Sequence, residues 1–370
     1  KKVMFLSLVA SFFYNFHLIQ RVDISTVEIL ITVFIKWKHN IRGYAMRKLL
    51  LGTTALAAAA SLTANAALAD VSISGMIEWS YNSRSSNVAA NDGTTFGQDS
   101  DMQVKFSNKT DSGLTIGMTV DLDTDGNDVG ANKDETALSI SGGFGKIVLG
   151  QDDAAADSYI IDESDLIAED QAPSVTSATI GTSSSLSLQD GDNNKIAYHL
   201  PAMGGLTAGV SFTDAGAAAT SADTTTYGAK YSMSAAGAAI TLGYTTATTD
   251  NATQDKDSSN MGMKVVSGDI SLIVSQGNTE SNDEDIENQG ASISYKMPNG
   301  MTIGAYTFKS EDDLDAGEEY SRSGAEVQYT IASGLTAVIN VDDYDYKAGT
   351  SETTVSDSGT NTRLTIKASF

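Results

Sequence analysis

Apolar and polar residues alternate with a period of two along most of the chain after residue 69. Between residues 114 and 122 every second residue is apolar, and threonine, glycine or aspartate stands between them. The same alternation recurs at 71–81, at 335–341 and at the C-terminus, 363–370. Successive side chains of a β-strand point to opposite faces, so this pattern predicts strands with one apolar and one polar face.

About sixteen segments of the chain carry this pattern. Many are close to the ~9–11 residues that a tilted strand needs to cross a bilayer. The strands expected are 71–81, 99–109, 113–123, 134–141, 144–151, 193–200, 205–214, 223–234, 238–247, 258–266, 269–277, 287–297, 300–310, 319–330, 334–343 and 360–370.

Short and long connections alternate between these segments. Tight turns such as 142–143 and 298–299 are followed by long polar stretches such as 278–286 and 347–359. Outer-membrane barrels have short periplasmic turns and long external loops. An even number of strands places both chain ends on the periplasmic side.

The apolar face of these strands decides the environment. In water it would be a very large exposed patch, whereas lipid solvates it and forbids open strand edges. The sheet must therefore close, and with about sixteen strands its polar interior is too wide for side chains to fill. The sequence predicts an all-β transmembrane antiparallel barrel. The competing architecture, a soluble β-solenoid or adhesin, requires a fixed-period repeat, which the sequence lacks. The acidic run 121–126 resembles a calcium loop only faintly, and we interpret it as a solvated loop.

The first 69 residues lack the alternating pattern that continues after them. Residues 46–69 combine Arg47 and Lys48, an apolar stretch and a small-residue end, which is the pattern of a secretory signal peptide. We expect cleavage before Asp70, with 64–66 as a second possible site. Residues 1–45 precede this signal and are interpreted as a mis-annotated upstream extension. The barrel is expected to comprise 70–370.

Charge and composition exclude several functions. Residues 70–370 carry 15 Lys and Arg against 45 Asp and Glu, a net charge of −30 that argues against binding to nucleic acid. The chain has no cysteine, so it has no disulfide or thiolate metal site. Residues 70–370 hold one histidine, His199, and no Gly-x-Ser-x-Gly motif. We therefore do not expect an enzyme.

Four segments of the chain resemble the Gram-negative general porins, in particular the alphaproteobacterial type that forms sixteen-stranded trimers. They are the first strand from Asp70 (DVSISG), the turn TDSGL at 110–114, the hairpin SGGFGKIVLG at 141–150 and the last strand ending in Phe370. The resemblance implies an outer-membrane homotrimer in contact with lipid and lipopolysaccharide, and recognition of Phe370 by the barrel-assembly machinery. It also implies passive diffusion of small hydrophilic solutes. No cofactor is expected, although some family members bind Ca²⁺ at loops and the acidic loops here leave that open without assignable ligands.

In this family the loop after the Phe-Gly hairpin folds into the barrel and narrows it. The corresponding segment here is 152–192, the longest connection, and it is rich in carboxylates and poor in cations. We expect an acidic constriction loop anchored by apolar residues such as Tyr159 and Ile161, the alternative being a disordered external loop. Its candidate pore residues are Asp152, Asp153, Asp157, Asp162, Glu163, Asp165, Glu169 and Asp170.

Most of the cations on the predicted strands fall on the polar face. Part of this is expected, because a charge facing lipid costs ~2–4 kcal/mol at the midplane. The functional interpretation is that some of them oppose the acidic loop and create a transverse field. The candidate wall residues are Lys105, Lys146, Lys230, Lys264, Lys296, Arg363 and Lys367, and with lower rank Lys195 and His199 near a rim.

The acidic excess predicts a porin with modest cation selectivity, because much of the charge lies in external loops that salt screens beyond ~8–10 Å. The alternative function is an adhesin or structural barrel without an open channel.

Overall fold

The computed structural model describes the barrel part of the chain. The described residues are 70–123, 132–168, 193–214, 222–251, 255–315, 317–350 and 355–370. The predicted signal peptide and the upstream extension lie outside them. Among the described residues, no helix is long and apolar enough to cross a membrane.

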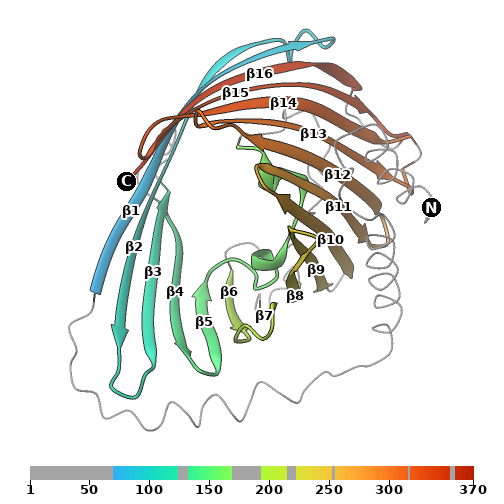
Figure 1. Ribbon diagram of the computed structural model, residues 1–370. Helices are drawn as coiled ribbons and strands as arrows, with labels where there is room; N and C mark the ends of the chain where they lie inside the picture. Colours follow the sequence, from blue (N-terminus) through green and yellow to red (C-terminus); the bar gives the residue numbers. More distant parts are fainter. Residues whose placement is uncertain are drawn as a thin grey trace. The chain divides into compact units, whose positions relative to one another are not determined.

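Sixteen antiparallel strands close into one barrel, in which each strand pairs with its neighbours in sequence and β1 pairs with β16 (Figure 1). The strands are β1 Asp70–Ser86, β2 Gly93–Lys109, β3 Thr115–Asp123, β4 Asn132–Gly142, β5 Gly145–Gln151, β6 Asn194–His199, β7 Leu206–Thr213, β8 Ala222–Ala235, β9 Ala238–Asn251, β10 Lys256–Ser267, β11 Ile270–Glu280, β12 Asp285–Lys296, β13 Met301–Asp312, β14 Glu319–Ala332, β15 Leu335–Lys347 and β16 Asp357–Ser369. Two short 3₁₀ helices, η1 Asp157–Tyr159 and η2 Glu163–Leu166, lie between β5 and β6. The predicted closed barrel of about sixteen strands is confirmed.

Several strands are longer than the alternation predicts, mainly at the ends that carry the long loops. The first strand continues to Ser86, where the pattern ended at residue 81, and the fifteenth continues to Lys347. Polar residues pair in these extensions, for example Ser83 with Thr94. Backbone pairing needs no apolar face, so it continues where the outer surface leaves the hydrocarbon and the hydrophobic signal stops.

The burial of the strands is inverted relative to a soluble protein. Large apolar side chains lie on the outside, and Ile73 is 68% and Ile339 52% exposed. Polar residues of the other face, such as Thr226 and Thr365, are fully buried. An apolar exterior with a polar interior is the arrangement that a lipid environment favours.

The barrel closes along the pairing of β1 with β16, which runs from Met76–Ser369 to Ser86–Gly359. On its inner side Arg363 Nη2 lies 2.7 Å from Glu78 Oε1, and Lys367 Nζ lies 3.8 Å from Glu78 Oε2. The backbone N–H of Phe370 donates to the carbonyl of Gly75 at 2.9 Å, which ties the C-terminus to the first strand.

Candidate functional site

Residues 152–168, here called the lumen segment, lie on the inner wall of the barrel. In Figure 1 the green segment after β5 enters the ring of strands, and η1 and η2 contact β8, β9 and β11–β13. The backbone N–H of Ala155 donates to Ser211 Oγ at 3.1 Å, and that of Ala156 donates to Thr226 Oγ1 at 3.4 Å. Ser211 and Thr226 are paired on β7 and β8, so the polar face of the sheet is the lumen face.

Glycines form the surface on which the lumen segment rests. A Cβ atom on Gly262 would lie 2.0 Å from the carbonyl oxygen of Ile161, and one on Gly290 would lie 1.9 Å from Glu163 Oε2. At Gly262 the obstacle is backbone, so no side chain fits there while the segment keeps its place. At Gly290 a side chain would have to displace the carboxylate of Glu163. We call this surface the glycine seat; its other members are Gly209, Gly228, Gly243 and Gly304.

Side chains fasten the lumen segment at several points. Tyr159 Oη and His199 Nδ1 are hydrogen-bonded at 2.9 Å, and burial raises the pKa of the Tyr159 hydroxyl, which keeps it protonated. Further along, the hydroxyl of Ser275 on β11 donates to Glu163 Oε2 at 3.1 Å. The segment is therefore attached to strands far apart around the wall.

The last described residue of the segment is held as well. The backbone N–H of Ala168 donates to Glu326 Oε1 on β14 at 2.8 Å. Glu326 was not among the candidates from sequence, although the alternation of β14 places it on the polar face.

The predicted loop carboxylates differ in their hydrogen bonds and in their exposure. Asp157 accepts from the backbone N–H of Ala154 at 3.1 Å, and Asp162 accepts from that of Ser164 at 3.0 Å, so both stabilise local turns. Glu163 is buried, whereas Asp153 and Asp165 are exposed to the lumen side. Asp152 offers its carbonyl oxygen to Lys195 Nζ. Glu169 and Asp170 lie outside the described residues.

Asp165 is the loop carboxylate with the clearest electrostatic setting. Although part of the Asp165 side chain reaches solvent, the surrounding protein removes some of its hydration. This loss of hydration, and next the charge of Asp162, raise the pKa of Asp165, while Lys264 and Lys230 act in the opposite direction. These lysines stand on β10 and β8, within the arc of wall on which the segment rests. They therefore neighbour the loop acids, whereas the sequence interpretation had cations facing the loop across the lumen.

The strand register places all nine predicted wall residues on the lumen face. These residues are Lys105, Lys146, Lys195, His199, Lys230, Lys264, Lys296, Arg363 and Lys367. They do not act as one basic surface. Arg363 and Lys367 share Glu78, and Lys195 binds a loop carbonyl. The ion pairs with Glu78 join β16 to β1, strands at opposite ends of the sequence, which the alternation cannot reveal.

Two lumen-facing arginines were missed at the sequence level, Arg84 on β1 and Arg322 on β14. Arg322 Nη2 lies 3.2 Å from Asp342 Oδ1, and both side chains are almost fully buried. The guanidinium also stands 5.0 Å from the centre of the Tyr306 ring, a cation–π distance. Arg322 could have been placed from the sequence, because it stands at every second position with Tyr320 and Gly324 and so shares their face of β14.

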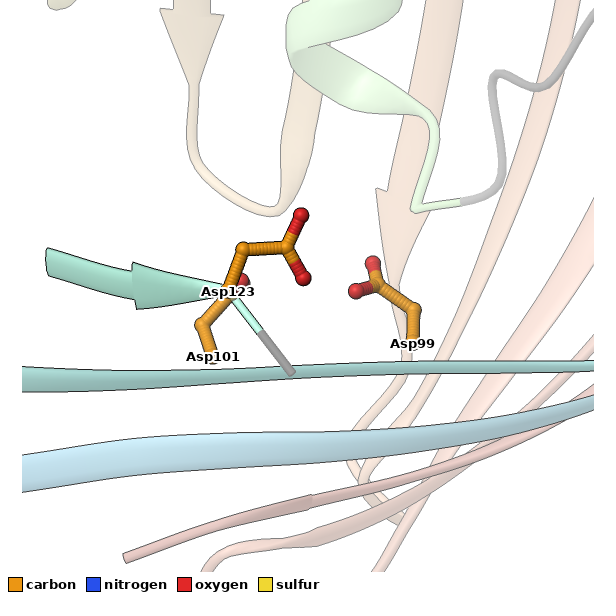
Figure 2. Close-up of side chains that lie close together, drawn as sticks. All are labelled: Asp99, Asp101 and Asp123. Atoms are coloured by element: carbon orange, nitrogen blue, oxygen red, sulfur yellow. The ribbon is translucent and has the colours of Figure 1, made fainter. Parts of the chain in front are cut away.

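Three carboxylates gather on the lumen face of β2 and β3. The ligand oxygens of Asp99, Asp101 and Asp123 all lie within 4.8 Å of one another (Figure 2). Asp101 and Asp123 are direct cross-strand partners, and like charges so placed repel one another. The cluster therefore gathers three acidic groups on this part of the lumen wall.

A closed sixteen-stranded barrel with an apolar exterior and a charged polar lumen defines the class of outer-membrane β-barrel channels. The sequence matches the model of a family described as Gram-negative porin over residues 52–368, and the chain belongs to this family. It is thus an outer-membrane porin channel and not an enzyme.

Solved porin structures share the fold. An anion-selective porin from Comamonas acidovorans is 16% identical, with a TM-score of 0.60 over 82% of this chain and 100% of that one. A mutant of the Rh. blastica porin is 14% identical, with a TM-score of 0.61 over 81% and 100%. OmpT from Vibrio cholerae in its trimer form is 13% identical, with a TM-score of 0.61 over 82% and 99%. No curated protein matches the sequence.

Proposed function

We propose that the barrel is a water-filled channel through which small hydrophilic solutes and ions diffuse passively, with a modest preference for cations. The observation that carries this proposal is the acidic lumen segment lying along the inner wall. Its Asp153 and Asp165 are exposed to solvent. In the proposed channel the segment narrows the passage, and permeating solutes pass these carboxylates.

The distribution of lumen charge supports the direction of the preference. Glu78 offsets Arg363 and Lys367, and Asp342 offsets Arg322. Lys230 and Lys264 stand beside Asp165 and Asp162. On β2 and β3 the Asp99–Asp101–Asp123 cluster adds three carboxylates to the lumen wall. The anion preference named for the Comamonas porin belongs to a chain with 16% identity, at which lumen charges are free to differ.

The proposal includes the assembly. A homotrimer embedded in lipid and lipopolysaccharide is supported by the trimer form recorded for OmpT and by the exposed apolar exterior of β1, for example Ile73 and Ile77. Recognition by the barrel-assembly machinery would use Phe370, which is 83% exposed.

Recordings on purified protein in a planar bilayer test the function. Large stable conductance steps and a reversal potential of cation-selective sign in a KCl gradient are expected. Absence of conductance would favour the alternative of a structural barrel or adhesin, and a reversal potential of the opposite sign would refute the selectivity.

A further inference from the structure

We propose that Glu326 is a positioning residue of the channel: from β14 it holds the lumen segment at Ala168 and so sets how far the segment reaches into the pore. This inference rests on the proposed channel function and names a residue that controls it.

The contact joins a buried carboxylate to a backbone amide. Ala168 N donates to Glu326 Oε1 at 2.8 Å, while Glu326 is only 4% exposed. Glu326 lies on the lumen face, paired with Gly304 on β13 and Asn340 on β15. The distance is that of a well-formed hydrogen bond, and its acceptor is buried in the wall, so the contact attaches the segment to β14.

The wall behind Glu326 keeps the carboxylate in place. Asn340 Nδ2 donates to Glu326 Oε2 at 3.4 Å, and the Tyr306 hydroxyl donates to Asn340 Oδ1 at 3.2 Å. The Tyr306 ring lies against Arg322, which is paired with Asp342. All these residues are buried, so the acceptor presented to Ala168 is fixed by the barrel and is unable to follow the segment if it moves.

The bond between Ala168 and Glu326 lies on a different part of the wall from the other attachments of the segment. The other hydrogen bonds described for the segment lie on β6, β7, β8 and β11; their partners are Lys195 and His199, Ser211, Thr226 and Ser275, respectively. Glu326 attaches the segment at β14, three strands beyond Ser275. Beneath this end, Ile167 Cδ1 rests 3.0 Å from where a Cβ of Gly304 would lie. Loss of the bond at Ala168 therefore removes the attachment to β14, while the contacts of the segment with β6–β13 remain.

Glu326→Ala and Glu326→Gln separate positioning from charge. Both remove the negative charge, but the glutamine retains an amide oxygen that accepts from Ala168. We expect Glu326→Ala to show excess open-channel current noise and an altered mean conductance, because losing the bond shifts the attached-to-released ratio about tenfold. Glu326→Gln should stay close to the parent protein. If both variants change equally, charge and not position is responsible, and the inference is overturned.

Ala168→Pro tests the same bond from the other partner and leaves the wall untouched. Proline removes the N–H, and Ile167 already has φ −115° and ψ 123°, a conformation that suits the residue before proline. The noise of Glu326→Ala should reappear, and the double variant should add nothing further. Parent-like recordings from Ala168→Pro would overturn the inference even if Glu326→Ala failed to fold.

Gln328→Ala is the matched control, because Gln328 lies on the same face of β14, two residues nearer the turn to β15. It should leave the noise unchanged, and noise equal to that of Glu326→Ala would overturn the inference. A parent protein without any conductance would refute the proposed function instead, whereas a conducting Glu326→Ala without added noise would refute only the role of Glu326.

Discussion

Two arcs of the barrel wall differ in what they offer the lumen. The arc from β7 to β14 presents the glycine seat, small hydroxyl residues and Glu326, and it carries the lumen segment. The arc formed by β16, β1, β2 and β3 presents charged groups: the Glu78 pairs and the Asp99–Asp101–Asp123 cluster. We propose that the first arc, through the segment that it carries, sets the shape of the passage, and that the second contributes charge without carrying the segment.

The largest effect on shape should follow from filling the glycine seat. Gly262→Val would place atoms where the Ile161 carbonyl lies, so we expect the segment to be displaced, at a cost of ~1–3 kcal/mol in stability, and conductance to change strongly. Single-channel recording combined with thermal unfolding measures both effects. Gly143→Ala, at a turn with nothing near its Cβ position, is the control and should behave like the parent.

In the charged arc the largest effect should be on stability. Arg363→Ala leaves Glu78, whose side chain is 9% exposed, with the more distant Lys367 at 3.8 Å, and we expect a loss of about 3 kcal/mol. Lys367→Ala should cost far less, because Lys367 is 42% exposed. Unfolding of the purified barrel by urea compares the two variants, and equal losses would contradict the assigned pairing.

Neutralising the carboxylate cluster should change selectivity without changing shape. We expect the combined Asp99→Asn and Asp101→Asn substitutions to lower the cation-to-anion permeability ratio about two- to threefold, since a screened lumen charge contributes under about 1 kcal/mol. Conductance noise should stay at the parent level. An unchanged reversal potential would show that the cluster does not face the permeating ions.

A smaller effect on cation preference is expected from lowering the pH, because Asp165 of the lumen segment becomes protonated. Because the pKa of Asp165 is raised, its negative charge is lost at a higher pH than that of a free aspartate. Cation preference should therefore begin to fall, as the pH drops, above the ordinary aspartate range near ~4. Asp165→Asn should remove this early part of the reversal-potential titration and leave the later part.

The sequence predicted the strands well because lipid imposes one apolar face on each of them. It did not predict the polar extensions such as that of β1 to Ser86, where the hydrocarbon no longer selects the outer residues. It placed the lysines and Arg363 on the lumen face, but not their partners: Glu78 and Arg363 are 285 positions apart and meet only through the closing register. The glycine seat was not predicted, because a glycine is neither apolar nor polar enough to mark one face of a strand.

The most direct test of the account places a thiol on the lumen segment. The parent sequence has no cysteine, so Asp165→Cys gives a single reactive site. During bilayer recording, a water-soluble thiol reagent should lower the current in discrete steps, and bulkier reagents should lower it further. An accessible thiol whose modification leaves the current unchanged would contradict the claim that this segment narrows the channel.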